Sequence, residues 1–193
     1  VVIESDDWGS IRMPSREIYQ NLLKKGYNVD KDPYLKYDSL ATVNDLTHLF
    51  EVLSGIKDKN GRNPIITATT VVANPDFIKI READYEMYFY ESFLTTLSKY
   101  KDCQNSFNLW QQGIDLGLFC PQFHGREHLN VSQWLRALQT QNKNILEAFN
   151  NSMISISSEP SPLKYSYMEG MDFFNENEKE SRKAILEEGL SLF

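Results

Sequence analysis

The chain has 193 residues, with 20 lysines and arginines against 27 aspartates and glutamates, so its formal net charge is −7. Hydrophobic residues make up 41% and charged residues 24%, which is the composition of a soluble globular protein with enough apolar material for a core. The acidic balance argues against a nucleic-acid or anionic-membrane partner, since both favour a basic surface. No apolar run approaches the roughly 20 residues of a membrane-spanning helix.

The length favours one domain over residues 1–193. The chain opens on Val1 with neither an initiator methionine nor a signal peptide, and it stops at Phe193 within an apolar helical pattern. We interpret both ends as trimmed, so the native compartment is not visible in the sequence. Two cysteines, Cys103 and Cys120, are too few for a disulfide framework, and two buried thiols are favoured over a single bridge.

In the first half of the chain, short apolar runs rich in β-branched residues predict strands, and apolar residues at helical spacing predict helices. Ser15 is the expected cap of the first helix, and Gly26 its stop. The predicted elements are a strand over Val1–Ser5, a helix over Ser15–Lys25, a helix over Val43–Ile56 and a strand over Ile65–Ala73, which Asn74-Pro75 ends.

The second half continues the same alternation. The predicted elements are a helix over Tyr85–Tyr100, a short helix over Phe107–Ile114, a strand over Leu118–Phe123, a long amphipathic helix over Val131–Phe149, a strand over Met153–Ser157, an irregular loop over Glu159–Phe174 and a last helix over Glu178–Leu192. This order points to an α/β fold built from βαβ units around a parallel sheet. In such folds the chemistry lies at the carboxyl ends of the strands, and two polar clusters occupy positions of that kind.

The first cluster is Ser5-Asp6-Asp7-Trp8-Gly9, at the end of the first predicted strand. Adjacent carboxylates at a strand end point in different directions, so one can hold a metal while its neighbour acts as a general base. Gly9 allows a tight turn and the close approach of a ligand. The alternative is that the two aspartates only cap the turn before the next helix.

The second cluster is His124-Gly125-Arg126-Glu127-His128, at the end of the third predicted strand. Two histidines four residues apart on a helical turn face the same side, within reach of one metal ion. Two imidazole nitrogens and one aspartate oxygen make an open site for zinc or a similar divalent ion, with positions left for water and substrate. The alternative is a pair of solvent-facing histidines, with Asp7 and His124 far apart in space.

Together the two clusters resemble motifs of the polysaccharide deacetylases of the NodB-homology group. Asp6-Asp7-Trp8-Gly9 resembles the first motif of that family, T-F-D-D-G, and the segment from His124 to His128 resembles the second, H-[S/T]-x-x-H. The resemblance implies a distorted (β/α) barrel with one divalent metal, zinc before cobalt, nickel or manganese. It also implies that Asp6 is the base and that Asp7, His124 and His128 are the metal ligands.

The sequence departs from the family pattern at several places. Trp8 stands between the aspartate pair and Gly9, and Gly125 replaces the usual serine or threonine. The stretch between the two motifs is longer than in the family, which implies insertions near 27–64 and 75–117. The third motif normally follows a helix like the last one predicted here, and the fourth and fifth motifs are not found. The resemblance therefore covers about the front half of such a domain and implies an incomplete barrel.

The implied activity is metal-dependent removal of N- or O-acetyl groups from a carbohydrate, with Asp6 taking a proton from a metal-activated water. No residue is a clear general acid, because the remaining histidine, His48, falls in a helical pattern where a structural or surface role is expected. Two alternatives stay open. One is another metal-dependent hydrolase of a C–N or glycosidic bond on the same scaffold, and the other is a catalytically silent carbohydrate-binding relative.

Four further residues near the motifs have a functional and a plain interpretation. Trp8 could stack on a sugar ring or belong to the core. Arg12 could neutralise substrate or the aspartate pair, or be an ordinary surface arginine. Arg126 and Glu127 could orient the metal ligands, although exposed loop charges are the favoured interpretation. We include Trp8 and Arg12 among the expected substrate-binding residues.

Overall fold

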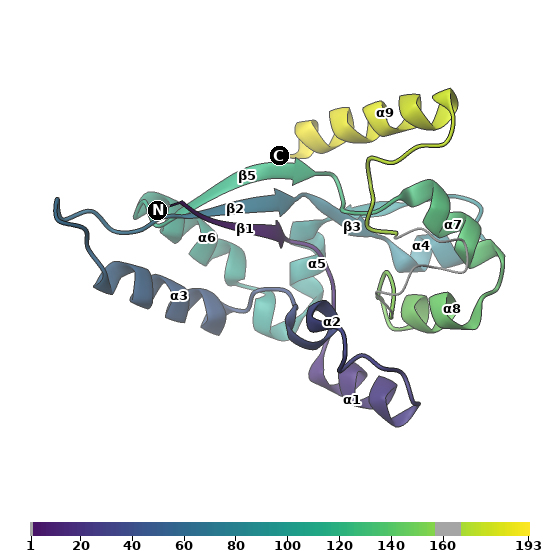
Figure 1. Cartoon of the computed structure of the whole chain (residues 1–193), viewed down its shortest axis with the longest axis horizontal. Helices are drawn as coiled ribbons and strands as arrows, with labels where there is room; N and C mark the ends of the chain where they lie inside the picture. The colour runs from purple at the N-terminus through teal and green to yellow at the C-terminus, as the bar shows by residue number, and fades with distance from the viewer. Residues whose placement is uncertain (1, 157–166) are drawn as a thin grey trace.

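The computed structural model of the chain describes residues 2–156 and 167–193. Three parallel strands form the central sheet in the order β1-β2-β5, where β1 is Ile3–Trp8, β2 is Ile66–Val71 and β5 is Phe119–Gly125 (Figure 1). The predicted parallel sheet is therefore confirmed. β1 runs further than expected, because it continues to pair with β2 beyond an irregularity between Ser5 and Trp8.

The segment between β1 and β2 holds three helices, and the segment between β2 and β5 holds a small antiparallel ribbon and several short helices. Their bounds are α1 Arg16–Lys24, α2 Pro33–Tyr37, α3 Val43–Gly55, β3 Ala73–Pro75, α4 Phe77–Glu82, β4 Tyr90–Ser92, α5 Phe93–Lys99, the 3₁₀ turn Lys101–Cys103 and α6 Ser106–Asp115. The predicted helices at 15–25, 43–56 and 107–114 are confirmed, and Ser15 caps α1 as expected.

Helices α3 and α6 lie side by side on one face of the sheet (Figure 1). Leu46 and Phe50 of α3 and Trp110 of α6 pack with Ile66 and Phe119 of the strands in one buried cluster. The opposite face is polar and open to solvent or half-buried. It carries Glu4, Asp6, Thr67, Thr69, Cys120 and Gln122.

Consecutive strands lie next to each other, and α3 and α6, one from each connection, pack on the same face of the sheet, an arrangement shared with one part of a (β/α) barrel. Among residues 2–156 and 167–193 the sheet stays open, with β1 and β5 as its edges. The distorted (β/α) barrel, expected to be incomplete in this chain, therefore remains a prediction. The segments expected to be insertions contain α2 and α3 (27–64) and α4 to α6 (75–117), and their status as insertions stays a prediction.

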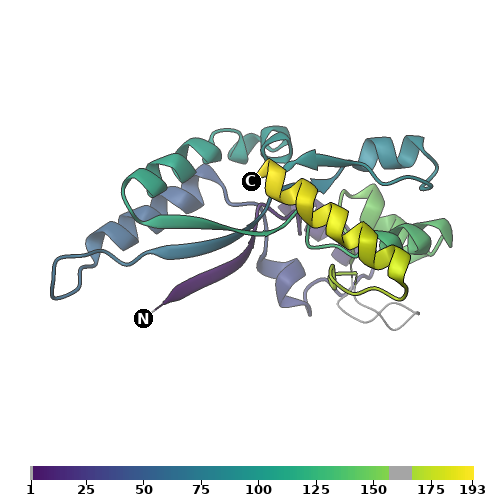
Figure 2. The same ribbon diagram turned by 90° about the horizontal axis from the view of Figure 1, so that it is seen from above.

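The remaining helices follow β5. They are α7 Val131–Gln139, α8 Lys143–Asn150 and α9 Glu176–Leu192. Trp134 of α7 and Phe149 of α8 are fully buried in a second cluster with Ile80 of α4. Seen from above in Figure 2, α9 lies over the end of β5. No described helix is both long and apolar enough to cross a bilayer.

The helix predicted over Tyr85–Tyr100 is wrong. Asp84 and Tyr85 have positive φ angles of 50° and 63°, which end α4, and Tyr90–Ser92 then pairs with Ala73–Pro75 as an antiparallel strand. Aromatic residues favour the extended conformation, and the Ser92 hydroxyl caps a new helix, α5, by accepting from the backbone of Thr95.

The single helix predicted over Val131–Phe149 is also wrong, because it is two helices. The break lies at Gln141, whose φ angle is 56°. The next residue, Asn142, caps α8 with its side-chain oxygen, which accepts from the backbone of Asn144 and Ile145. An asparagine side chain that competes for backbone groups in this way ends a helix as readily as it begins one. Asn130 caps α7, because its side-chain oxygen accepts from the backbone nitrogen of Gln133.

Two smaller expectations are also corrected. The described part of the predicted strand over Met153–Ser157 is irregular, although Met153 and Ile156 are buried. The predicted loop is confirmed over 167–174, and the rest of that prediction lies in 157–166, outside the described residues. Of the two thiols expected to be buried, Cys103 is buried, whereas Cys120 is exposed on the polar face of β5.

Candidate metal centre

The first motif lies at the carboxyl end of β1, where the strand turns sharply. Asp7 has a φ angle of 61° and Gly9 one of 84°, both in the left-handed region. Aspartate tolerates this conformation better than most residues, because its short polar side chain can bond locally. A Cβ at Gly9 would lie 2.7 Å from the carbonyl oxygen of Val71, so only glycine lets the turn approach β2 this closely.

The second motif lies at the carboxyl end of β5. His124 is the penultimate residue of the strand, and His128 lies in the segment between β5 and α7. The carboxyl ends of parallel strands meet at one edge of a sheet, so the fold brings both histidines to the edge that also carries Asp7. The alternative in which Asp7 and His124 lie far apart is therefore wrong.

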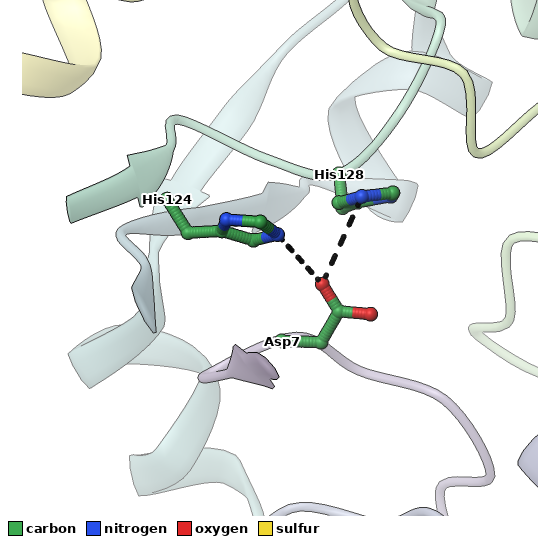
Figure 3. A group of neighbouring side chains, drawn as sticks. All are labelled: Asp7, His124 and His128. Atoms are coloured by element: carbon green, nitrogen blue, oxygen red, sulfur yellow. Dashed lines mark ion pairs between the residues drawn. The ribbon is translucent and has the colours of Figure 1, made fainter. Parts of the chain in front are cut away.

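One oxygen of Asp7 faces both imidazole rings (Figure 3). Asp7 Oδ1 is 3.4 Å from His124 Nε2 and 3.9 Å from His128 Nε2. The two rings are stacked, with centroids 5.3 Å apart. These residues form the only group of three or more histidine, cysteine or acidic side chains in the described ranges whose donor atoms converge, all within 4.8 Å of one another.

The donors suit a tetrahedral metal. Zinc ligands at about 2.0–2.1 Å from the ion stand about 3.3 Å from each other, close to the 3.4 Å between Asp7 Oδ1 and His124 Nε2 and shorter than the 3.9 Å between Asp7 Oδ1 and His128 Nε2. Asp7 Oδ1 is buried and accepts no hydrogen bond from any described residue. A buried carboxylate oxygen without a partner is costly, and a cation would satisfy it. The three residues therefore fit a divalent ion as candidate ligands.

The charge state of His128 also favours metal binding. Burial lowers the pKa of His128, and the neighbouring His124 and Arg12 lower it further, while Asp7 acts in the opposite direction. A histidine with a lowered pKa is neutral at pH 7 and keeps a lone pair for a metal. Its Nδ1 is buried and receives no partner from the residues the structure describes.

Arg12 holds the other oxygen of Asp7. Its Nη2 donates to Asp7 Oδ2 at 2.5 Å, and its Nη1 donates to the sulfur of Met168 at 3.0 Å. The side chain of Arg12 is only 15% exposed, so the interpretation as a surface arginine is wrong. Because Arg12 occupies Oδ2, it directs Oδ1 toward the histidines.

Asp6 points elsewhere. Its Oδ1 accepts a hydrogen bond of 2.8 Å from the hydroxyl of Thr69 on β2, and the residue is exposed. It is not one of the three converging donors. The two adjacent carboxylates of the first motif thus point in different directions, as the sequence predicts.

A cavity of about 500 Å³ borders the turn, with Asp6, Asp7, Trp8 and Arg12 in its wall. Its other wall comes from the segment between α1 and α3, a contribution that sequence patterns did not indicate. These residues are Tyr34, Tyr37, Asp38, Ser39, Leu40 and Ala41, and Asp45 of α3, Leu97 of α5 and Trp110 of α6 complete the lining. Trp8 also packs edge-on against Trp110 and Phe119, with ring centroids 5.7 and 4.9 Å away. It therefore contacts both the core and the cavity.

The expectation that Arg126 and Glu127 are exposed loop charges is wrong. Their side chains are 5% and 2% exposed, and the Arg126 guanidinium donates to both Glu127 oxygens at 2.6 and 2.7 Å. The sequence alone does not show that this charged pair is buried, since arginine and glutamate normally lie at the surface. His48 is exposed on α3, as expected.

Comparison of the chain with protein-family models, with curated proteins and with solved structures found no match.

Proposed function

We propose that the protein is a metal-dependent hydrolase of the polysaccharide-deacetylase type, which removes N- or O-acetyl groups from a carbohydrate. The observation that carries this proposal is the buried, unpartnered Oδ1 of Asp7 facing two histidine nitrogens. One aspartate and two histidines suit a divalent ion, zinc first, with cobalt, nickel or manganese as other candidates. The resemblance of the two motifs to the NodB-homology group supports the choice of reaction.

Each residue of the site has a distinct task in this proposal. Asp7, His124 and His128 hold the ion, which when bound supplies Lewis acidity and lowers the pKa of a water. Arg12 fixes the orientation of Asp7 through Oδ2. Asp6 accepts the proton of the attacking water. The Thr69 hydroxyl donates to Asp6 Oδ1, and Asp6 Oδ2 is left to act as the base.

The cavity beside the turn is the proposed carbohydrate site. Trp8 and Tyr34 contribute aromatic surface on which a sugar ring can pack, and Arg12 and Asp38 contribute polar contacts. Burial raises the pKa of Asp38, and Asp7 and Asp32 add to that effect while Arg12 opposes it. The Asp38 carboxyl oxygens can accept hydrogen bonds from sugar hydroxyls in the cavity.

A catalytically silent carbohydrate-binding protein is the second candidate, and one observation favours it. The sequence holds only three histidines, and the third, His48, is exposed on α3. No histidine is therefore left in this chain to protonate the leaving group from the site. A further metal-dependent hydrolase of a C–N or glycosidic bond would use the same ligands and the same base.

The proposal is tested by acetate release from acetylated chitooligosaccharides and acetylated xylan, with zinc-loaded protein. We expect release by the wild type and a loss of about 100-fold in Asp6→Asn, the usual contribution of a general base. Asp6→Asn should keep its zinc, because Asp6 is not among the converging donors. Asp30→Asn, which changes an exposed aspartate outside the cavity, is the control.

Zinc-loaded wild type that binds these sugars and releases no acetate would favour the silent binding protein. Full activity in Asp6→Asn would contradict the role of Asp6 as the base, whatever the substrate.

A further inference from the structure

Helix α9 follows the histidine segment along its length, in the opposite direction. Near its amino end, Arg182 donates from Nη2 to the side-chain oxygen of Asn130 at 2.6 Å, two residues beyond His128. At its carboxyl end, the Phe193 ring lies 5.9 Å from the ring of Phe123, the residue before His124. The helix thus contacts the chain just before His124 and just after His128.

Between these two contacts, α9 also holds the middle of the segment. Glu188 forms an ion pair with Nη1 of Arg126, whose side chain is 5% exposed. Next to it, a Cβ at Gly189 would lie 2.9 Å from the backbone nitrogen of Arg126 and 2.9 Å from the Phe123 ring. A glycine at this position lets the helix backbone approach the segment directly.

Arg126 itself is anchored from several sides. Its guanidinium binds Glu127 and lies 4.3 Å from the centre of the Tyr90 ring on β4. Its carbonyl oxygen accepts from the backbone of Val72 and Ala73 at 3.0 and 2.7 Å. Arg126 therefore fixes the backbone between His124 and His128, and Glu188 is its contact from α9.

We propose that α9 positions the metal-binding histidines, with Glu188 and Phe193 as positioning residues that act through Arg126 and Phe123. This inference rests on the proposed metal site. A metal-ligating histidine normally donates its second ring nitrogen to a carboxylate or carbonyl, which fixes the ring. His128 Nδ1 has no such partner among the described residues. The position of the ring then depends on the stacked His124 ring and on the backbone that carries His128, and α9 contacts that backbone at Arg126.

The test measures zinc affinity by competition with a chromophoric chelator, and the absorption spectrum of the cobalt form. Glu188→Ala is the first variant, with Glu187→Ala as its control, because Glu187 is an exposed neighbour with no ion pair in the structure as described. Phe193→Ala is the second, with Leu190→Ala as its control, since both side chains are more than half exposed and their removal leaves the core intact. Thermal unfolding of every variant shows that the fold is retained.

We expect Glu188→Ala and Phe193→Ala each to weaken zinc binding about 10-fold, the lower end of the effect of outer contacts on a metal site. The cobalt spectrum should change with them, while both control variants match the wild type. Wild-type affinity and an unchanged cobalt spectrum in both test variants would overturn the positioning role and leave the metal site standing. Wild type that binds no zinc would overturn the proposed function together with this inference.

Discussion

The turn after β1 shows how single residues set the candidate site. Asp7, with its left-handed φ angle, presents one oxygen to Arg12 and the other to the histidines. Gly9 completes the turn under the backbone of Val71. A change at Gly9 therefore displaces the carboxylate that the whole site depends on, although Gly9 has no side chain of its own.

We predict that Gly9→Ala destabilises the protein by about 3 kcal/mol, of which the left-handed conformation accounts for about 1 kcal/mol and the collision with Val71 for the rest. Gly26→Ala is a matched control, because its φ angle of 86° nearly equals the 84° of Gly9 and a Cβ there meets no atom within 4 Å. Urea unfolding compares the two variants. Equal losses of stability in both would contradict the steric argument.

At this scale the sequence predicted the site better than its surroundings. Asp7, His124 and His128 could be placed together because parallel strands bring their carboxyl ends to one edge of the sheet. The burial of Arg126 and Glu127 could not be predicted, since it depends on Tyr90 and α9, which come from distant parts of the chain. Local patterns carry no information on such contacts.

At the scale of elements, α9 is fastened to the rest of the molecule by polar contacts more than by an apolar face. Glu178, in its first turn, accepts from the backbone nitrogen of Phe174 at 2.9 Å and forms an ion pair with Arg136 of α7. The hydrogen bond from Phe174 lowers the pKa of Glu178, and Arg136 adds to this against the effect of burial. The attachment of α9 therefore depends on pH.

A carboxylate with a lowered pKa stabilises the folded state above its unfolded pKa, near 4.5, and this contribution is lost as the pH falls through the folded value. We expect Glu178→Gln to lower the free energy of unfolding by about 1 kcal/mol at pH 7. This difference between the wild type and the variant should become smaller as the pH falls below 4.5. Denaturant titrations between pH 3 and 7 measure this. Glu180→Gln, an exposed neighbour, is the control, and a difference that does not change with pH would contradict the account.

Element boundaries were predictable where a local signal was decisive. Ser15 and Gly26 bound α1, and the β-branched run from residue 66 forms β2. The split between α7 and α8 depends on one left-handed residue, Gln141, within a continuous amphipathic pattern, and the pattern alone favours a single helix. β4 forms only because β3 offers it a partner, which is a non-local cause.

At the scale of the whole molecule, the candidate metal centre spans the sheet. Asp7 comes from β1 and His124 from β5, and β2 lies between these two edge strands. An ion bound by Asp7 and His124 would link the two edge strands of this small open sheet, and α9 packs against the histidine segment. The parallel topology followed from the alternation of strands and helices, whereas a barrel needs more strands than the three that form the parallel sheet in the described residues.

The most direct measurement is the metal content of the purified protein by elemental analysis after incubation with excess zinc and dialysis. We expect about one zinc per chain in the wild type and in His48→Ala, whose histidine is exposed on α3, and no zinc in His124→Ala. Wild type without zinc, or His124→Ala that retains it, would contradict the Asp7–His124–His128 centre.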